Sequence, residues 1–439
     1  MKTRINFKDE FYQKLKLLVL PIAIQNFMLA LVSATDAIML GWIDQTSLSA
    51  VSLAGQVQFV LSLFISGIAA GAGIMAAQYW GKQDAASIEK VIPIALRTNL
   101  LFSGLFTILA GFCPEMLMRI FTNDAALVAS GSQYLRAVAL SYVLCGISQV
   151  YLILLKNTGH AAVSSRISST AVVLNIILNA ILIYGLCGAP ALGIRGAAYA
   201  TVAARVVELI WAYLETKKPE RVRILWNRLF SSAGKILSED FWRYTLPVLA
   251  ASLVWGIAYV LYSVIMGHMG SDAVAANSIT SIAKSLLSCL IRGVSGGAGV
   301  LIGNLLGANE LEKAREYGRR LSHLSIAIGI VTGGLLMLIS PAIVHFAPLS
   351  DTAAEYLQYM LLFCGLNLMA QSVNTTVLDG IFCAGGDAKF DMQGNIGAMW
   401  CFSVPLGFLA AFWLKLPVMV VYCIVNLDEI VKLLSLIHI

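Results

Sequence analysis

Long apolar runs alternate with short polar stretches along the whole chain. Each run has about 20 residues or more, the length that an α-helix needs to cross the hydrocarbon core of a bilayer. Twelve runs are predicted to span a membrane: 14–40, 50–78, 91–112, 126–155, 163–186, 194–215, 241–267, 272–302, 318–346, 353–382, 390–414 and 416–436. The pattern therefore predicts an all-α polytopic membrane protein with twelve transmembrane helices, six in each half.

Composition supports this class. The 439 residues are 59% hydrophobic and 12% charged, and the mean hydropathy is +0.80. Ordinary soluble domains contain roughly 25% charged residues. A soluble protein is therefore excluded, and the remaining charges become informative about topology.

Basic residues are distributed unevenly among the predicted loops. They collect at the N-terminus and in the loops after even-numbered spans, for example Lys82, Lys217 and Arg319, whereas the other loops hold few. Because basic residues stay on the cytoplasmic side, both ends of the chain are predicted to be cytoplasmic. The net charge of +6 is a topology signal, and no nucleic-acid partner is predicted.

The two halves of the chain repeat each other. A constant offset of 226 positions places Pro21 on Pro247 and Gly71 on Gly297 without a gap, and six spans in each half make the repeat parallel. Small residues let helices approach closely and localise bends. Pro21, Pro247, Gly71 and Gly297 are therefore predicted to serve packing and hinge bending.

These patterns define the expected domains: an N-lobe at 1–215, a cytoplasmic linker at 216–240 and a C-lobe at 241–439. The basic N-terminus leads into the first span without a small-residue cleavage site, so this span is predicted to be retained. The last span ends without a basic tail, and we expect the C-terminus to be truncated or foreign. The eight cysteines are scattered without a CxxC pair and are predicted to fill space within spans.

Asp36 is the first candidate for function, because an ionisable residue deep in a span is costly and functional by default. It lies 15 residues beyond Pro21, roughly 22 Å along the first span, in the outer half of the bilayer. Its repeat partner is Tyr262, so the symmetry is broken here. The alternative interpretation is a carboxylate that merely reaches interfacial water.

Four polar side chains on other spans are expected at the same depth as Asp36. Asn175 and Asn179 share one face of the fifth span, Thr201 lies on the sixth and Tyr134 on the fourth. Together these groups offer oxygen atoms to a proton or to a small hard cation. For each asparagine alone, an interhelical hydrogen bond is an equally good explanation.

Charged residues of the second half are weaker candidates. Lys284 and Arg292 lie deep in the eighth span, and Asp379 is expected to neutralise one of them. An unpaired Lys284 facing a cavity would instead repel cationic ligands. In the first half, Arg205 and Glu208 are predicted to form a local ion pair.

Amide and aromatic residues of the second half are candidates for a substrate cavity. Gln371 and Asn374 are predicted polar groups of this cavity. Trp255, Tyr259 and Tyr262 are predicted to form an adaptable wall through stacking and cation–π contacts. The alternative for each aromatic residue is packing or interfacial anchoring.

Several motifs together resemble the multidrug and toxic compound extrusion (MATE) transporters, in particular the DinF- and MepA-like bacterial branch. They are Leu20-Pro21-Ile22 to Gly41, Gly67 to Gly73, Ala77-Gln78-Tyr79-Trp80-Gly81, and Ala384-Gly385-Gly386-Asp387 followed by Trp400 and Pro405. The resemblance implies two pseudo-symmetric six-helix bundles in a V-shaped arrangement around a cavity that opens alternately to either side. It also implies cation-coupled export of amphipathic, often cationic, drugs by a monomer in the bacterial plasma membrane.

The resemblance further implies a coupling site in the N-lobe. Asp36, Asn175 and Thr201 match positions that line the cation site of DinF-like members, and Tyr134 lies where they often carry tyrosine. Asn179 departs from the family, which commonly has aspartate there. Two hypotheses follow: Asp36 alone takes up a proton, or Na⁺ binds at Asp36, Asn175, Asn179 and Thr201. We favour the proton, because a carboxyl group among neutral partners can load and release it.

The predicted function is therefore secondary active multidrug efflux in exchange for H⁺ or Na⁺, without a cofactor. The alternative is a lipid or lipid-linked glycan flippase of the same superfamily, which would favour cavity-facing cations such as Lys284 and Arg292. An enzyme is not predicted, because the spans carry no HExxH, GxSxG or P-loop motif.

Overall fold

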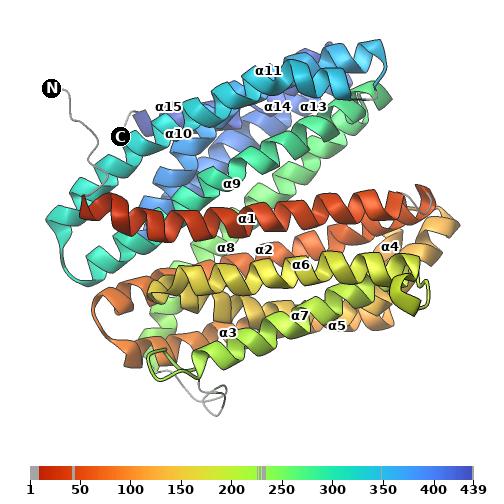
Figure 1. Ribbon diagram of the computed structural model, residues 1–439. Helices are drawn as coiled ribbons and strands as arrows, with labels where there is room; N and C mark the ends of the chain where they lie inside the picture. The colour runs from red at the N-terminus through yellow and green to blue at the C-terminus, as the bar shows by residue number, and fades with distance from the viewer. Residues whose placement is uncertain are drawn as a thin grey trace. The chain divides into compact units, whose positions relative to one another are not determined.

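The computed structural model describes residues 9–41, 45–224, 226, 229, 234–347 and 349–437, and these residues form helices and connecting turns with no strand (Figure 1). The first half contains α1 (Glu10–Gly41), α2 (Gln45–Gly81), α3 (Ala85–Phe112), α4 (Pro114–Arg119), α5 (Ala125–Leu155), η1 (Lys156–His160), α6 (Ala161–Tyr184), η2 (Leu186–Gly188) and α7 (Ile194–Thr216).

The second half begins at α8 and ends in several shorter helical segments. These are α8 (Lys235–Gly267), α9 (Ser271–Gly307), α10 (Leu311–Phe346), α11 (Asp351–Asn374), η4 (Thr375–Phe382), α12 (Ala388–Asn395), η5 (Ile396–Ser403), α13 (Val404–Phe408), η6 (Leu409–Trp413), α14 (Val418–Val425) and α15 (Asp428–Ile437). The segments η4, η5 and η6 are π-helical turns, which are rare and often mark functional positions. In η1, Thr158 and Gly159 have non-helical backbone angles, so η1 is a kinked turn between α5 and α6.

The twelve predicted spans all coincide with helices. Within the described residues, ten helical stretches are long and apolar enough to cross a membrane. One of them, Ala125–Tyr184, contains two predicted spans, because η1 joins α5 to α6. The predicted span 416–436 is divided into α14 and α15, each too short to cross alone. The all-α fold with twelve spans is confirmed.

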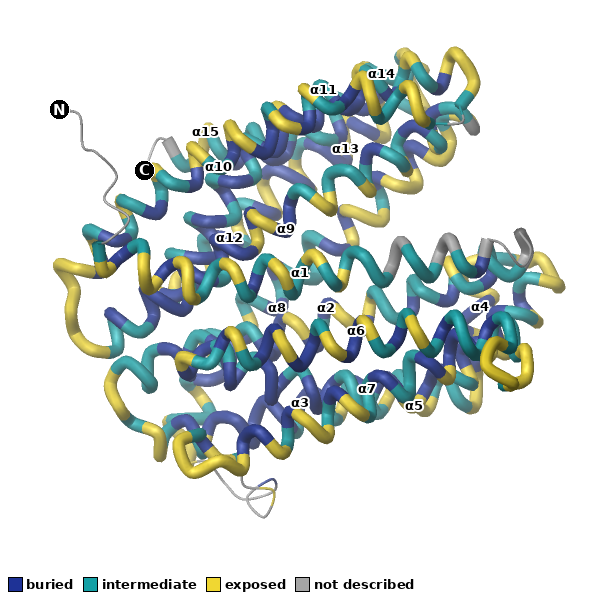
Figure 2. The backbone as a smooth tube through the Cα atoms, in the orientation of Figure 1, coloured by how far each residue is buried: buried dark blue, intermediate teal, exposed yellow. Residues whose placement is uncertain are grey.

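Burial follows the pattern expected for a membrane protein. Figure 2 shows exposed positions along many helices, and several carry large apolar side chains: Leu101 is 68% exposed and Leu338 is 78% exposed. Such side chains are stable when they face hydrocarbon. Small and medium apolar residues fill the interior of each half, for example Leu61 and Tyr142 in the first and Leu357 and Met360 in the second.

The chain forms two compact units whose boundaries lie inside helices. One unit consists of Phe27–Leu249, and the other consists of Met1–Asn26 with Ala250–Ile439. The start of α1 thus belongs to the unit formed by the second half, and the start of α8 to the unit formed by the first half. The lobes predicted at 1–215 and 241–439 differ from these units at both helices, and the lobe boundaries stay a prediction.

Close contacts of glycine residues also show that the start of α8 packs with the first half and the start of α1 with the second. A Cβ atom on Gly71 would lie 2.7 Å from Thr245 Cα in α8, and one on Gly67 would lie 2.9 Å from Leu249 Cα. In the second half, a Cβ atom on Gly297 would lie 2.9 Å from Val19 Cγ2 in α1. Val19 and Thr245 are themselves 226 positions apart, so the repeat extends to these contacts.

The sharp turns after α2 and α9 also repeat. Gln83 and Asn309, 226 positions apart, both have a φ of 60°, a left-handed conformation that is uncommon for residues other than glycine. The next residues, Asp84 and Glu310, donate their amides to Tyr79 and Leu305 carbonyl groups at 2.9 Å. The duplication is therefore visible in the backbone as well as in the sequence.

Candidate functional site

Asp36 in α1 begins a chain of hydrogen bonds that crosses to two other helices. Asn179 Nδ2 in α6 donates to Asp36 Oδ1 at 2.6 Å and to Asn175 Oδ1 at 3.2 Å. Asn175 Nδ2 in turn donates to Thr201 Oγ1 in α7 at 3.3 Å. The structure thus brings together four of the five residues predicted for the coupling site, all within the unit Phe27–Leu249.

Helix geometry explains why these side chains meet. Asn175 and Asn179 are one turn apart on α6, so both face the same neighbours, and α6 packs against α7. Thr201 Oγ1 donates to the Ala197 carbonyl at 3.0 Å, which leaves its lone pairs for the asparagine. Asn179 thus donates to Asp36 and to Asn175, and Asn175 donates to Thr201.

Tyr134 in α5 is the fifth predicted residue. It is 8% exposed, and Asp36 is the charged group that acts on it electrostatically. Its side chain belongs to a buried cluster that also contains Leu135, Val138 and Tyr142. Tyr134 therefore places an aromatic wall near the carboxylate.

The cluster has one buried acceptor left over. Asn179 Oδ1 has no hydrogen-bond partner among the described residues, and Asn179 is fully buried. An unpaired buried polar atom costs roughly 1–3 kcal/mol, so it is retained only where something offsets that cost. This oxygen is suited to accept a hydrogen bond or to bind a small cation.

Arg205 and Glu208 form the predicted ion pair in α7. Arg205 Nη1 lies 3.0 Å from Glu208 Oε2, and Ser148 Oγ in α5 donates to Glu208 Oε1 at 2.5 Å. Glu208 is 2% exposed. Because the carboxylate is held by a cation and a hydroxyl, this pair is structural and separate from the Asp36 cluster.

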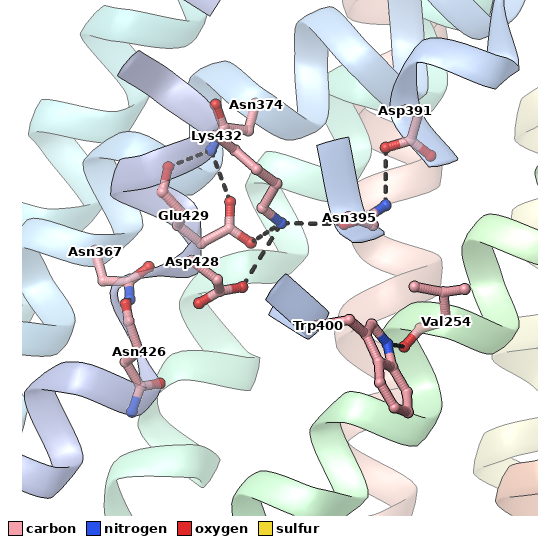
Figure 3. Close-up of polar contacts among 10 residues, drawn as sticks. All are labelled: Val254, Asn367, Asn374, Asp391, Asn395, Trp400, Asn426, Asp428, Glu429 and Lys432. Carbon is pink, nitrogen blue, oxygen red and sulfur yellow. Dashed lines mark hydrogen bonds and ion pairs between the residues drawn. The ribbon is translucent and has the colours of Figure 1, made fainter. Parts of the chain in front are cut away.

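A second polar network lies in the second half, where the last span is broken (Figure 3). Asn367 Nδ2 donates to the Asn426 carbonyl at 2.6 Å, and Asn374 Nδ2 donates to the Glu429 carbonyl at 2.7 Å. Asn367 and Asn374 are seven residues apart, which places them on one face of α11. They supply donors to backbone carbonyls at the break between α14 and α15, as a break at membrane depth requires.

Charged side chains fill this network. Lys432 Nζ lies 3.0 Å from Glu429 Oε1 and 3.7 Å from Asp428 Oδ2, and it donates to Asn395 Oδ1 at 3.3 Å. Asn374 Nδ2 also donates to Glu429 Oε2 at 2.8 Å. Figure 3 shows Asp428, Glu429 and Lys432 of α15 pointing toward Asn374 and Asn395.

Further acidic groups surround the network. Asn395 Nδ2 donates to Asp391 Oδ1 at 3.0 Å, and Asp379 in η4 interacts electrostatically with Asp391 and Lys432. The predicted neutralisation of Lys284 or Arg292 by Asp379 receives only weak support: Arg292 is the least of the groups acting on Asp379. Within the described residues, no group of three or more His, Cys, Asp or Glu side chains is arranged to hold a metal ion.

The predicted cationic and amide residues of the substrate cavity occupy different settings. Lys284 acts electrostatically on Asp428 and Glu429. Asn374 is 3% exposed and donates to Glu429, and its role in a substrate cavity stays a prediction. Gln371 Oε1 accepts from Ser288 Oγ at 3.5 Å.

The predicted aromatic wall is divided in the same way. Trp255 and Tyr259 stack with ring centroids 5.6 Å apart, and Tyr259 is 42% exposed. Tyr262 is 9% exposed and packs in a core cluster with Met399 and Val421. This packing follows the alternative interpretation for Tyr262, and its place in a substrate wall stays a prediction. Trp400 Nε1 donates to the Val254 carbonyl at 3.0 Å (Figure 3).

Asp428, Glu429 and Lys432 are not among the residues predicted from the sequence, where the end of the chain is expected to be truncated or foreign. A usable signal was present: Asp428 and Glu429 precede Lys432 by four and three residues, which aligns three charges on one helix face inside an apolar run. Asn426, just before them, is the type of residue that occurs where a helix breaks.

Comparison with known proteins places this chain among transporters. The family model described as MatE matches residues 21–181 and 247–409. A probable multidrug resistance protein NorM from Thermotoga maritima is 24% identical over 415 residues, which cover 93% of this chain and 87% of that protein. A probable multidrug resistance protein, YoeA, from Bacillus subtilis is 21% identical over 426 residues, covering 96% and 91%.

Solved structures agree on the fold. A MOP superfamily transporter from Pyrococcus furiosus superimposes with a TM-score of 0.87 at 19% identity, covering 99% of this chain and 97% of that one. An outward-facing multidrug resistance MATE family transporter gives the same TM-score, identity and coverage. At this identity the likeness concerns the fold alone.

Proposed function

Since the chain belongs to the MatE family, whose model matches most of both halves, we propose that this multi-pass membrane transporter is a secondary active multidrug efflux pump. Its proposed substrates are amphipathic organic compounds, many of them cationic, and their export is driven by protons that move inward. The multidrug resistance names of the Thermotoga and Bacillus relatives support this substrate class.

The observation that carries the proposal is the hydrogen-bond chain from Asp36 to Thr201. Asp36 is a membrane-embedded carboxylate whose bonded partner, Asn179, is neutral. Glu208, by contrast, is paired with the guanidinium of Arg205. A carboxylate held by an amide can gain and lose a proton during a transport cycle.

Protonation changes what Asp36 requires from Asn179. The ionised carboxylate accepts from Asn179 Nδ2, whereas the protonated group must donate one hydrogen bond. Asn179 meets this need by turning its amide, so that the free Oδ1 faces Asp36. That rotation removes the bond from Asn179 Nδ2 to Asn175 Oδ1 and thereby changes the contact between α1, α6 and α7.

Transport follows from the difference between the two states. The drug enters from the cytoplasm or inner leaflet, and the outward-open state then receives a proton on Asp36. The altered packing lowers the affinity for the drug, which leaves, and release of the proton on the inside resets the cycle. Only a differential affinity of the two states for drug and proton can drive this exchange.

Na⁺ is the competing coupling ion. Asp36, Asn175, Asn179 and Thr201 offer oxygen ligands that suit it chemically. Asn179 presents its N–H group to the carboxylate, so Na⁺ binding, like protonation of Asp36, requires Asn179 Oδ1 to turn toward the same space. Imposed pH and Na⁺ gradients separate the two coupling ions.

The test is export of a fluorescent organic cation from proteoliposomes under an imposed pH gradient and, separately, an imposed Na⁺ gradient. We expect wild-type export under the pH gradient alone. Asp36→Asn keeps the size of the side chain but cannot bind a proton, so it should lose at least about 90% of this export. Asp124→Asn is the matched control, because asparagine caps a helix as well as aspartate does and Asp124 lies at an exposed N-terminus of α5.

Three results would contradict the proposal. Export that requires Na⁺ would assign the coupling site to the sodium ion. Export that persists in Asp36→Asn would move the coupling elsewhere. Absence of organic-cation export under both gradients would favour the lipid flippase.

We also propose the bacterial plasma membrane as the location, with both chain ends in the cytoplasm and the monomer as the active form. The distribution of Lys and Arg among the loops supports the orientation. The protein uses no cofactor in this mechanism, since the ion gradient supplies the free energy.

A further inference from the structure

An apolar groove lies between α5 and α7, beside Trp226 of the connector that follows α7. Its volume is about 370 Å³, near the lower end of the range for pockets that hold small molecules. The lining residues are Ile147, Tyr151, Leu209, Ile210, Tyr213 and Trp226. All six belong to the unit Phe27–Leu249. None belongs to the Asp36 cluster or to the residues predicted for the substrate cavity.

Trp226 is held in a defined position over this groove. Its Nε1 donates to Tyr151 Oη at 2.7 Å, and Tyr151 is fully buried. The rings of Tyr151 and Tyr213 meet edge to face with centroids 6.3 Å apart. Because the tyrosine hydroxyl already binds the indole, the groove presents aromatic faces and aliphatic side chains to its occupant.

The ammonium group of Lys217 lies at the rim of the groove. Lys217 Nζ lies 4.4 Å from the centroid of the Tyr213 ring, which itself lines the groove. The neighbouring Lys218 and Arg221 are engaged by Glu215, at 2.8 and 3.1 Å. Lys217 is exposed and has no carboxylate partner in the part of the chain that the structure describes.

The combination defines the chemistry of the occupant. An apolar groove open to the lipid-facing side accepts a hydrocarbon chain; Ile210 is 53% exposed and Leu214 beside it is 56% exposed. The cation at the rim attracts an anionic headgroup and repels a cationic drug. Trp226 and Tyr213 are of the aromatic types that lie at the headgroup level of a membrane.

We propose that this groove is a binding site for an anionic phospholipid from the surrounding leaflet. One acyl chain lies between α5 and α7 under Trp226, and the phosphate binds Lys217. The bound lipid ties the connector after α7 to the helix pair, because Trp226 contacts both the lipid and Tyr151. This inference is independent of the drug-efflux function.

The experiment uses the full-length protein, stripped of lipid in detergent. Phosphatidylglycerol and phosphatidylcholine with identical acyl chains are titrated separately, and native mass spectrometry gives a dissociation constant for each. We expect phosphatidylglycerol to bind about fivefold or more tightly, the effect of one basic residue near a lipid phosphate. Glycerol phosphate, which has the headgroup but no chain, should not compete at equal concentration.

Two substitutions separate the headgroup contact from the chain contact. Lys217→Gln should weaken phosphatidylglycerol more than phosphatidylcholine, because only the former carries a net negative charge, and should thereby remove the preference for phosphatidylglycerol. Ile210→Trp fills the groove and should weaken both lipids at least about tenfold. Lys235→Gln and Ile108→Trp are the matched controls, since Lys235, the first residue of α8, does not line the groove and Ile108 is 57% exposed on α3.

The outcomes decide the proposal. Equal affinity of the two lipids for wild type, or an unchanged preference in Lys217→Gln, overturns the headgroup assignment. Unchanged binding in Ile210→Trp overturns the groove, as does equal competition by glycerol phosphate. If Ile210→Trp fails to fold, Trp226→Ala replaces it: loss of the groove's wall should also weaken both lipids, and unchanged binding again overturns the site.

Discussion

The carboxylate of Asp36 and that of Glu208 lie in the same unit but in opposite settings. Glu208 is bound by a guanidinium and a hydroxyl, whereas Asp36 is bound by an amide. The first carboxylate therefore has a cationic partner and the second a neutral one, although both residues are acidic groups within spans. The proposed proton exchange at Asp36 rests on this difference.

Asn179→Asp should change the pH dependence of transport. It places a second carboxyl group 2.6 Å from Asp36 Oδ1, where two negative charges repel and one proton is shared. The proton is then held to higher pH, so the midpoint of the pH–transport profile should rise by about one unit or more. Export rates measured between pH 5.5 and 9 in proteoliposomes test this. An unchanged midpoint would show that Asn179 does not govern the proton.

Lys432→Met should destabilise the protein strongly. Lys432 is 6% exposed, and its removal leaves Glu429 and Asp428 buried without their cation. Breaking a buried ion pair from one side costs about 3–5 kcal/mol. Thermal unfolding in detergent, followed by loss of the monodisperse peak, should show a clear fall in midpoint. The double variant Glu429→Gln/Lys432→Met should recover part of it; a double variant as unstable as the single one would contradict the pairing.

At the scale of elements, the break between α14 and α15 shows how a span can be interrupted inside a membrane. Its carbonyl groups are bound by Asn367 and Asn374 from α11, at 2.6 and 2.7 Å. The charges of α15 then lie beside polar partners instead of lipid. The length of the apolar run predicts one continuous span at 416–436, because the average hydropathy of the run does not reveal the break.

The N-terminus of α3 provides a pH-dependent test outside the spans. Asp84 accepts from Ser87 N at 3.0 Å and from Ser87 Oγ at 2.6 Å, and these bonds hold the pKa of its carboxyl group below the usual value of 3.8. A lowered pKa in the folded state stabilises the fold above the unfolded-state pKa, and this contribution is lost as the pH falls through the folded-state pKa.

Asp84→Ala should therefore cost about 1 kcal/mol at pH 7, the usual cost of losing a helix cap. The difference in unfolding midpoint between wild type and variant should shrink below about pH 4. Asp84→Asn keeps the cap without the charge and should remove the pH dependence while it retains most of the stability. A difference that stays constant from pH 7 to pH 3 would contradict the role of the charge.

For the whole molecule, the duplication sets which contacts are crowded. Gly71 approaches Thr245 so closely that a Cβ atom added to Gly71 would lie 2.3 Å from Thr245 Oγ1. A Cβ atom added to Gly104 would meet no neighbouring atom within 4 Å. Gly71→Ala should lower the free energy of unfolding by about 1–3 kcal/mol through overpacking. Gly104→Ala, the control, should be neutral or stabilising by up to about 1 kcal/mol. Equal midpoints for the two variants would show that the contact at Gly71 is not tight.

The sequence predicts the fold well because its signals are local. Apolar run length gives the spans, and the offset of 226 gives the duplication. The Asp36 cluster was also predictable, since depth along each span places Asn175, Asn179 and Thr201 at one level. The network at Asp428, Glu429 and Lys432 was not, because it depends on a helix break and on amides that come from another helix.

The exchange of helix starts between the two units has a consequence for biosynthesis. The surface around Gly67 and Gly71 is covered by Thr245 and Leu249, which the ribosome makes after all six spans of the first half. Likewise, the start of α1 can pack against Gly293 and Gly297 only after α9 has been made. The first half therefore stays incomplete in the membrane until the seventh span is inserted, and two separately made halves could mature only as an intertwined pair, like the two chains of a domain-swapped dimer.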